Sequence, residues 1–174
     1  RDSDYRGTYK PVGPVDSLAF LASRGLSWRQ AKLDVGQSYE ARGFPDSAVA
    51  EYLGLIRDLP LGEPPYRLAG HALMEAGDTA RALPYLQRAY GVQPTAYTAY
   101  ELGMVAAKAK DYQHAVGYLR QAAQMDPNDP QTVYQLSLAS ALNHDIQGAR
   151  AAAMQVARLK PDYPGLAGWL RALG

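Results

Sequence analysis

The sequence predicts an all-α solenoid of antiparallel helix pairs, because small residues recur along the chain at a nearly constant interval. The intervals are 34, 33 and 34 residues, and they separate Gly36, Gly70, Gly103 and Ser137. An alanine follows each small residue by twelve positions, and a proline follows each alanine by another twelve. A period of this length is typical of stacked helical repeats, in which each unit buries its apolar face against its neighbours. The alanines are Ala48, Ala82, Ala115 and Ala149, and the prolines are Pro60, Pro94, Pro127 and Pro161.

The third unit shows why each repeat is expected to contain two helices. Leu102 and Ala106 are four positions apart and share one face of a first helix. Ala115 and Leu119 share one face of a second helix in the same way. Between the two helices, Asp111 is suited to an N-cap, because its carboxylate can accept hydrogen bonds from the free amides of the next turn. The proline that closes the unit prevents the second helix from continuing.

The small residues have a steric role in this arrangement. Two helices can cross closely where glycine or alanine removes side-chain bulk, while larger residues fill the remaining space. A large side chain at Gly103 or Ala115 should therefore push the pair apart, at a cost of about 1–3 kcal/mol. Asp78 and Asp145 occupy the place of Asp111 in the second and fourth units.

The repeat divides the chain into segments with different expected roles. We expect an extended leader over 1–14, an N-terminal helix with its connection over 15–27, four repeats over 28–161, and a capping helix over 162–174. The four units run over about 28–60, 63–94, 96–127 and 130–161. The apolar end of a solenoid needs a cap. The predicted cap carries a helical stripe made of Leu166, Trp169, Leu170 and Leu173.

Composition excludes several classes of function. The 174 residues carry 18 basic and 17 acidic side chains, so a net charge of +1 gives no general attraction to nucleic acid. The absence of cysteine excludes disulfides and thiolate chemistry. No apolar stretch approaches the roughly 20 residues that a membrane-spanning helix needs. No signal-peptide pattern is visible, and the start at Arg1 indicates a processed protein or an excised piece of a longer one.

The pattern resembles the tetratricopeptide repeat family over about residues 28–161. The residues that carry the resemblance in the third unit are Leu102-Gly103, Tyr112, Ala115, Leu119, Ala122 and Pro127. Ser137 departs from the family pattern by replacing a glycine, and the early tryptophan of the family is lacking. In the first unit, Phe44-Pro45-Asp46 replaces the simple aspartate turn. The resemblance implies a right-handed superhelix in which the first helix of each pair lines the concave surface.

This placement of the first helices, combined with helical spacing, selects a partner-binding groove. We expect the groove to carry Gln37, Arg67, His71, Met74, Tyr97, Tyr100, Met104, Lys108, Tyr134 and Leu138. Tyr97, Tyr100, Met104 and Tyr134 form the predicted anchor patch, because tyrosine offers a large rigid surface and methionine adapts its shape. The expected partner is a protein or peptide, bound as an extended strand or an amphipathic helix. The alternative is that these tyrosines pack between neighbouring helices as core.

Some members of the family clamp a C-terminal carboxylate with lysine and asparagine side chains on the inner helices. At the matching positions of this chain, Arg67 alone fits such a role. We therefore expect that the chain is not a chaperone-tail receptor of that type.

No sequence motif predicts catalysis. HExxH, a glycine-rich phosphate loop and GxSxG are all absent. His71, His114 and His144 lie in three different repeats, so we expect neither a metal site nor a cofactor, and we do not expect an enzyme. His144-Asp145 is interpreted as a turn histidine beside an N-cap.

Two alternatives to a peptide-binding scaffold remain at this point. The first is an accessory repeat domain fused to a catalytic domain outside these residues. The second is self-association, either through an exposed cap at Trp169 and Leu173 or through a leader arm that contains Tyr5, Tyr9 and Pro11.

Overall fold

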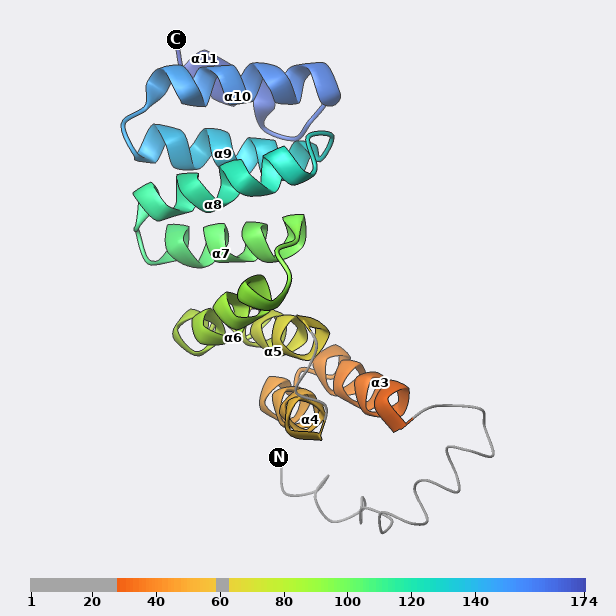
Figure 1. Ribbon diagram of the computed structural model, residues 1–174. Helices are drawn as coiled ribbons and strands as arrows, with labels where there is room; N and C mark the ends of the chain where they lie inside the picture. The colour runs from red at the N-terminus through yellow and green to blue at the C-terminus, as the bar shows by residue number, and fades with distance from the viewer. Residues whose placement is uncertain (1–27, 59–62) are drawn as a thin grey trace.

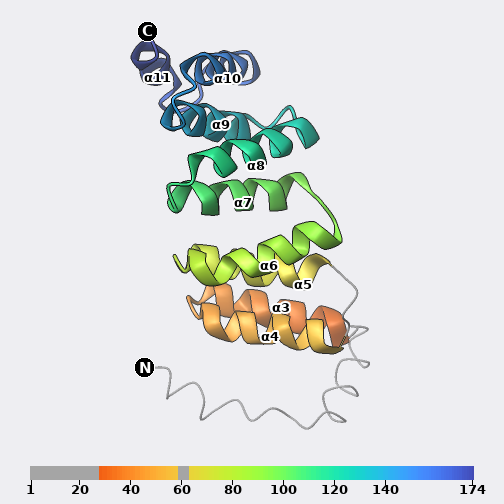
Figure 2. The ribbon, with the colours of Figure 1, turned by 60° about the vertical axis from the view of Figure 1, so that its left-hand side comes forward.

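The computed structural model describes residues 28–58 and 63–174, and every regular element within them is a helix (Figure 1). The helices are α3 (Trp28–Ala41), α4 (Pro45–Asp58), α5 (Glu63–Glu75), α6 (Thr79–Val92), α7 (Ala96–Lys108), α8 (Tyr112–Met125), α9 (Pro130–Leu142), α10 (Ile146–Leu159) and α11 (Leu166–Ala172). Successive antiparallel pairs stack along one direction (Figure 2), which confirms the predicted all-α solenoid. The predicted leader and N-terminal helix lie outside the described residues.

Each pair is closed by the same tight turn, in which one residue adopts a left-handed backbone. That residue is Gly43, Gly77, Lys110 or His144, with φ between 61° and 80°. The amide that follows it bonds back to the carbonyl five residues earlier, as from Asp111 to Ala106 at 2.9 Å. This hydrogen bond satisfies a carbonyl that the end of the first helix would otherwise leave free.

The same turns start the second helices. Asp78, Asp111 and Asp145 immediately follow the left-handed residue, and each side chain accepts a hydrogen bond from a backbone amide three residues later. One aspartate therefore completes the end of the first helix through its amide and caps the second through its carboxylate. The predicted N-caps are confirmed.

The second helices end where the repeated prolines require it. Helices α6, α8 and α10 each end two residues before a proline. The residue between helix and proline has φ from −150° to −132°, well outside the helical range. This conformation is expected, because the proline ring disfavours helical backbone in the residue that precedes it.

The two helices of a pair cross at the small residues. A Cβ atom added at Gly70 would lie 2.6 Å from Cγ of Leu86, and one at Gly103 would lie 2.6 Å from Cγ of Leu119. The fourth pair has Ser137 at this position, and the residue that corresponds to Leu119 in the repeat is Ala153. A smaller residue on one helix thus accompanies a larger residue on the other.

Ser137 also has a polar role that glycine could not fill. Its buried hydroxyl donates to the carbonyl of Ala149 at 2.6 Å and accepts from the indole Nε1 of Trp169 at 2.7 Å. Both hydrogen-bonding functions of this buried group are therefore satisfied. The bond from Trp169 connects α11 to α9.

Helix α11 covers the end of the stack. Leu166 and Leu173 are buried with Val133, Ala149, Ala153 and Val156, while Trp169 and Leu170 pack against this cluster. The expectation that Leu173 is an exposed surface for self-association is wrong, because only 7% of this residue remains accessible. The apolar stripe of the cap is used to close its own core.

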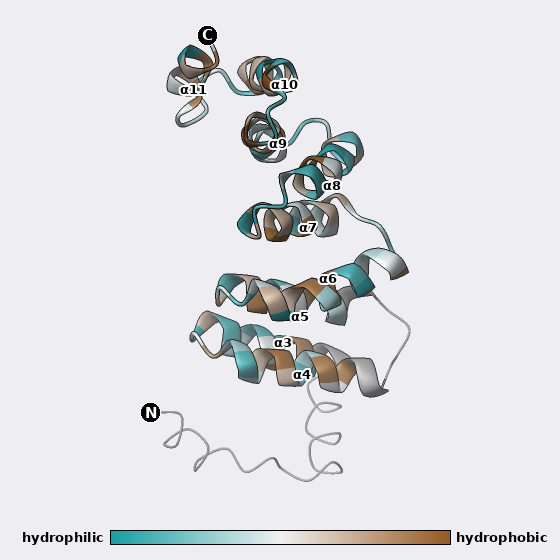
Figure 3. Ribbon diagram, turned by 90° about the vertical axis from the view of Figure 1, so that its left-hand side faces the viewer, coloured by the Kyte–Doolittle hydropathy of each residue, from teal (hydrophilic) through white to brown (hydrophobic). Residues whose placement is uncertain are grey.

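Each helix carries both hydrophilic and hydrophobic residues, as expected where one side packs on neighbours and another faces solvent (Figure 3). Among the helices of the described ranges, none is long and apolar enough to cross a membrane.

We predict that Gly103→Ala lowers the free energy of unfolding by about 1–3 kcal/mol, because the new methyl group meets Leu119. Gly117→Ala on α8 is the matched control. A Cβ there meets nothing within 4 Å, so we expect a gain of about 0.5–1 kcal/mol from helix propensity. Urea denaturation followed by circular dichroism measures both changes. An equal cost of Gly103→Ala in the wild type and in a Leu119→Ala background would contradict the steric explanation.

We predict that Lys110→Gly raises the free energy of unfolding by about 0.5–1 kcal/mol, because glycine adopts a left-handed backbone without the steric cost that a side chain carries. His144→Gly should act in the same direction. The reverse change, Gly77→Ala, should destabilise the protein by a similar or larger amount. Thermal and urea unfolding would show the three effects, and a loss of stability in Lys110→Gly would refute the assignment.

Candidate partner-binding cleft

The first helices of the pairs are joined to one another by polar and aromatic side chains. His71 on α5 places Nδ1 2.7 Å from the hydroxyl of Tyr97 on α7, and Nε2 3.9 Å from Glu40 on α3. Tyr100 on α7 accepts a hydrogen bond from Gln131 on α9 at 2.9 Å. A continuous row of contacts therefore runs across α3, α5, α7 and α9. We call the face that these four helices form together the first-helix surface.

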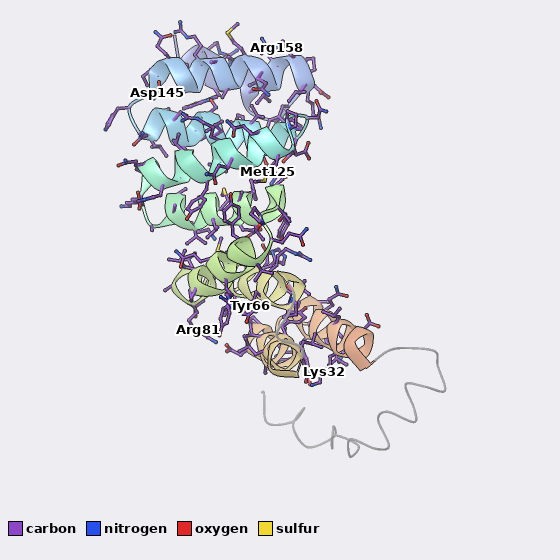
Figure 4. All side chains as sticks on the ribbon, viewed as in Figure 1. Lys32, Tyr66, Arg81, Met125, Asp145 and Arg158 are labelled. Carbon is purple, nitrogen blue, oxygen red and sulfur yellow. The ribbon has the colours of Figure 1, made fainter. Side chains whose placement is uncertain are left out.

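The second helices are joined by a separate set of contacts. Arg81 on α6, which is labelled in Figure 4, forms an ion pair with Asp46 on α4 at 2.9 Å, and Tyr90 on α6 donates to Gln121 on α8 at 2.8 Å. The two sets share no residue.

A cleft of about 520 Å³ opens on the first-helix surface. Its walls come from α5, from α7, from the connection that leads into α9, and from the first turn of α9. The lining residues are His71, Glu75, Ala96, Tyr97, Tyr100, Glu101, Asp126, Asp129, Gln131 and Thr132. This volume is within the usual range for ligand pockets, about 300–1,000 Å³.

His71 lies in an acidic environment at one side of the cleft. Its Nδ1 is 3.5 Å from a carboxylate oxygen of Glu101, which is itself only 8% exposed. The interaction with the Glu101 carboxylate raises the pKa of His71 above its usual value of 6.5. Burial of the ring opposes this change, and the negative charges of Glu101, Glu40 and Glu75 add to it. The buried glutamate therefore favours a charged imidazolium beside it.

Two tyrosines on adjacent turns of α7 form the aromatic part of the cleft. Tyr97 is 39% exposed, its ring meets His71 edge to face at 5.8 Å, and the guanidinium of Arg67 lies 5.2 Å from its centroid. Burial raises the pKa of Tyr97 and of Tyr100, and the charge of Glu101 adds to both shifts. Both side chains therefore remain neutral phenols over the physiological pH range.

The aspartates of the cleft are held by backbone contacts. Asp129 caps α9 by accepting from the amides of Gln131 and Thr132, and it also accepts from the Thr132 hydroxyl at 2.5 Å. Asp126 accepts from the amide of Asn128 at 3.3 Å. These hydrogen bonds fix the carboxylates in place at the α8–α9 connection.

Residues 67–130, from α5 to the start of α9, match the family model described as tetratricopeptide repeat. Residues 67–130 therefore form tetratricopeptide repeats. The matched range includes the whole of α6, α7 and α8 and holds every lining residue of the cleft but Gln131 and Thr132. The comparison with curated proteins found no match.

Solved structures share the fold of this chain. One is MamA 41-end from Desulfovibrio magneticus RS-1, with a TM-score of 0.78 and 23% identity over 83% of this chain and 82% of that chain. Another is YrrB, reported as a TPR protein with an unusual peptide-binding site. Its TM-score is 0.71, with 18% identity over 81% of this chain and 73% of that chain.

The structure distributes the predicted groove residues over different environments. His71, Tyr97 and Tyr100 line the cleft, and the guanidinium of Arg67 stacks on the ring of Tyr97 at the edge of the cleft. Gln37 and Lys108 are exposed on α3 and at the end of α7. Met74 is buried in the core, and Met104 packs against the same cluster. Tyr134 packs against Tyr163 with ring centroids 4.9 Å apart, and Leu138 is half-buried.

The predicted anchor patch is therefore divided between the cleft and the packing of the tetratricopeptide repeats. Tyr97 and Tyr100 line the cleft, whereas Met104 and Tyr134 contribute to packing only. Tyr100 does both, because it also packs against the buried cluster that contains Ala115 and Leu119. The predicted set of groove residues remains a prediction.

Four acidic residues line the cleft, Glu75, Glu101, Asp126 and Asp129, and none of them is in the predicted set of groove residues. Glu101 follows Tyr97 by four positions, so it lies on the same face of α7, and this spacing was a usable signal. Asp126 and Asp129 flank the repeat proline, where a capping or turn role explains an aspartate equally well. In the part of the chain that the structure describes, no group of three or more histidine, cysteine, aspartate or glutamate side chains could hold a metal ion.

We predict that Glu101→Gln lowers the pKa of His71, because the largest cause of its raised value is removed while burial still acts in the opposite direction. Glu75→Gln is the matched control and should lower it less, because the charge of Glu75 is the smallest contribution. Two-dimensional NMR titration of the histidine ring protons measures the pKa values. An unchanged His71 pKa in Glu101→Gln would contradict the assignment.

The same shift makes stability depend on pH. The pKa of His71 is higher in the folded state than the unfolded value of about 6.5, so its contribution is complete below that value. The contribution is lost as pH rises through the folded pKa. The difference in unfolding free energy between the wild type and His71→Gln should therefore be larger at pH 5.5 than at pH 8.5, in buffers of equal ionic strength.

Proposed function

We propose that this chain is a protein-interaction scaffold that binds an extended peptide or a partner helix across the first-helix surface, with the cleft as the centre of the site. The tetratricopeptide family match and the shared solenoid fold support the scaffold role in general. The observation that carries the specific proposal is the pair of tyrosines, Tyr97 and Tyr100, at an open cleft to which three repeats contribute.

The arrangement of these tyrosines supports recognition of a partner. Tyrosine has a large apolar face, few rotatable bonds and a polar tip, so it can bind a partner at a low cost in conformational entropy. Here the tips are already oriented by His71 and Gln131. The rings are thus held in position before a ligand arrives, which reduces the ordering cost of binding.

The path for a peptide follows from the contacts between the first helices. Because α5, α7 and the start of α9 all line the cleft, a ligand that fills it contacts consecutive repeats. YrrB offers a precedent within the fold for peptide binding. An extended peptide that crosses the first helices would extend beyond the cleft toward Arg67 and Gln37 on one side.

We predict that Tyr97→Leu with Tyr100→Leu weakens peptide binding about tenfold or more, because two contact side chains each lose more than about 1 kcal/mol. The probe is the strongest binder selected on the wild-type chain from a displayed library of random dodecapeptides, labelled with fluorescein. Fluorescence anisotropy measures the affinity, and circular dichroism checks that each variant is folded.

Tyr118→Leu on α8 is the matched control, because Tyr118 is a half-buried tyrosine that meets Tyr90 edge to face and does not line the cleft. It should leave the affinity unchanged. The proposal fails if no peptide is selected above background, or if the control variant weakens binding as much as the double variant does.

A further inference from the structure

We propose that the cleft is a subsite for a cationic side chain, arginine or lysine, of the bound peptide. This inference rests on the proposed function and adds the chemistry of the ligand to it. It is carried by three features found together in one cavity: a volume that can admit a long side chain, aromatic walls, and an excess of carboxylates with no lysine or arginine among the lining residues.

The charge of the cleft differs from that of the whole chain. The chain is nearly neutral, with a formal net charge of +1. The cleft is lined by Glu75, Glu101, Asp126 and Asp129, and its one basic group is His71. Even with a fully protonated histidine and the guanidinium of Arg67 at the edge of the cleft, the four carboxylates leave two negative charges in excess. A ligand that is drawn to this cleft by charge must therefore be positive.

The four carboxylates of the cleft differ in their burial and in their hydrogen-bond partners. Glu101 is buried and faces His71 at 3.5 Å, so much of its charge is balanced within the protein. Asp126 and Asp129 are held by backbone amides, which keep the carboxylates in position. Glu75 is exposed in the last turn of α5, where it can approach an incoming cation with little loss of hydration.

The aromatic walls fit the same ligand. A guanidinium or ammonium group is attracted to the face of a tyrosine ring, and the long aliphatic stem of the side chain can pack on the ring. The protein already makes this contact at the edge of the cleft, where the guanidinium of Arg67 lies 5.2 Å from the centroid of Tyr97. A ligand cation between Tyr97 and Tyr100 would repeat the same interaction beside four carboxylates.

Protonation of His71 determines the direction in which binding of the cation depends on pH. The groups that face His71 are Glu40 on α3, Glu75 on α5, and Tyr97 and Glu101 on α7, and the guanidinium of Arg67 lies over the ring of Tyr97 beside them. When the imidazole becomes charged, it adds a positive charge to the cleft and repels a cationic ligand. Binding of the cation should weaken as pH falls through the pKa of His71, and this dependence should be lost in His71→Gln.

The experiment uses small probes of the subsite and does not depend on finding the natural partner. N-acetyl-arginine methylamide is titrated into the full chain, and the shifts of the ring protons of His71, Tyr97 and Tyr100 are followed by NMR. N-acetyl-citrulline methylamide is the matched neutral probe, because it keeps the shape and the hydrogen-bonding head but lacks the charge. We expect saturable shifts at the three rings with arginine and weaker binding, by about tenfold, with citrulline.

A pair of variants tests which carboxylate contributes to binding of the arginine probe. Glu75→Gln should weaken binding of the arginine probe by about threefold, a size typical of a single partly exposed charge pair. Asp162→Asn is the control, because Asp162 is an exposed acid that does not line the cleft, and it should have no effect. Equal binding of both probes, or equal effects of Glu75→Gln and Asp162→Asn, would overturn the subsite.

The outcomes separate this inference from the proposed function. If selected peptides bind through Tyr97 and Tyr100 but the cleft does not prefer arginine over citrulline, the groove stands and the cationic subsite is rejected. If the arginine probe binds in the cleft but no library peptide is selected, the subsite stands and the peptide-binding function is rejected.

Discussion

The close crossing of two helices at each small residue is the constraint on which the rest of the structure depends. At Gly70 and Gly103, the facing leucine leaves no room for a Cβ atom. At Ser137, the corresponding position on the second helix is an alanine, and the serine hydroxyl joins α9 to α10 and α11. Each pair thereby becomes a thin, rigid unit with the same internal register. Stacking such units places the first helices beside one another, and the cleft lies between positions that recur from unit to unit.

The turns that contain Asp78, Asp111 and Asp145 reinforce this register, because each uses the same residue for two purposes. The aspartate after the left-handed residue satisfies the end of one helix through its amide and the start of the next through its carboxylate. Such a turn therefore fixes the relative position of the two helices that it joins. Side chains on consecutive first helices then meet at hydrogen-bond distance without any long loop to orient them, as His71 and Tyr97 do.

The site follows from a division of roles within each first helix. On α7, Thr98, Leu102 and Val105 are buried, whereas Tyr97, Tyr100 and Glu101 reach the cleft. Glu101 serves both regions, because it is nearly buried yet contacts His71 of the preceding repeat. A buried carboxylate next to a histidine holds that histidine in place and raises its pKa, so the stability of the stack and the charge of the cleft are linked through one pair of residues.

The sequence by itself determined the helix pairs, the close crossings, the capping aspartates and the helix ends at the prolines, because each depends on interactions between residues at a fixed distance along the chain. It also indicated the first helices as the place of a groove and included His71, Tyr97 and Tyr100 in it. It did not separate these residues from Met74, Met104 and Tyr134, which the structure places in the core or against Tyr163. Only the tertiary structure decided this, because the exposure of a side chain on a first helix depends on what the adjacent repeats and the α11 cap place over it. The acidic character of the cleft was decided in the same way, since Glu75, Glu101, Asp126 and Asp129 meet only when α5, α7 and the α8–α9 connection are stacked.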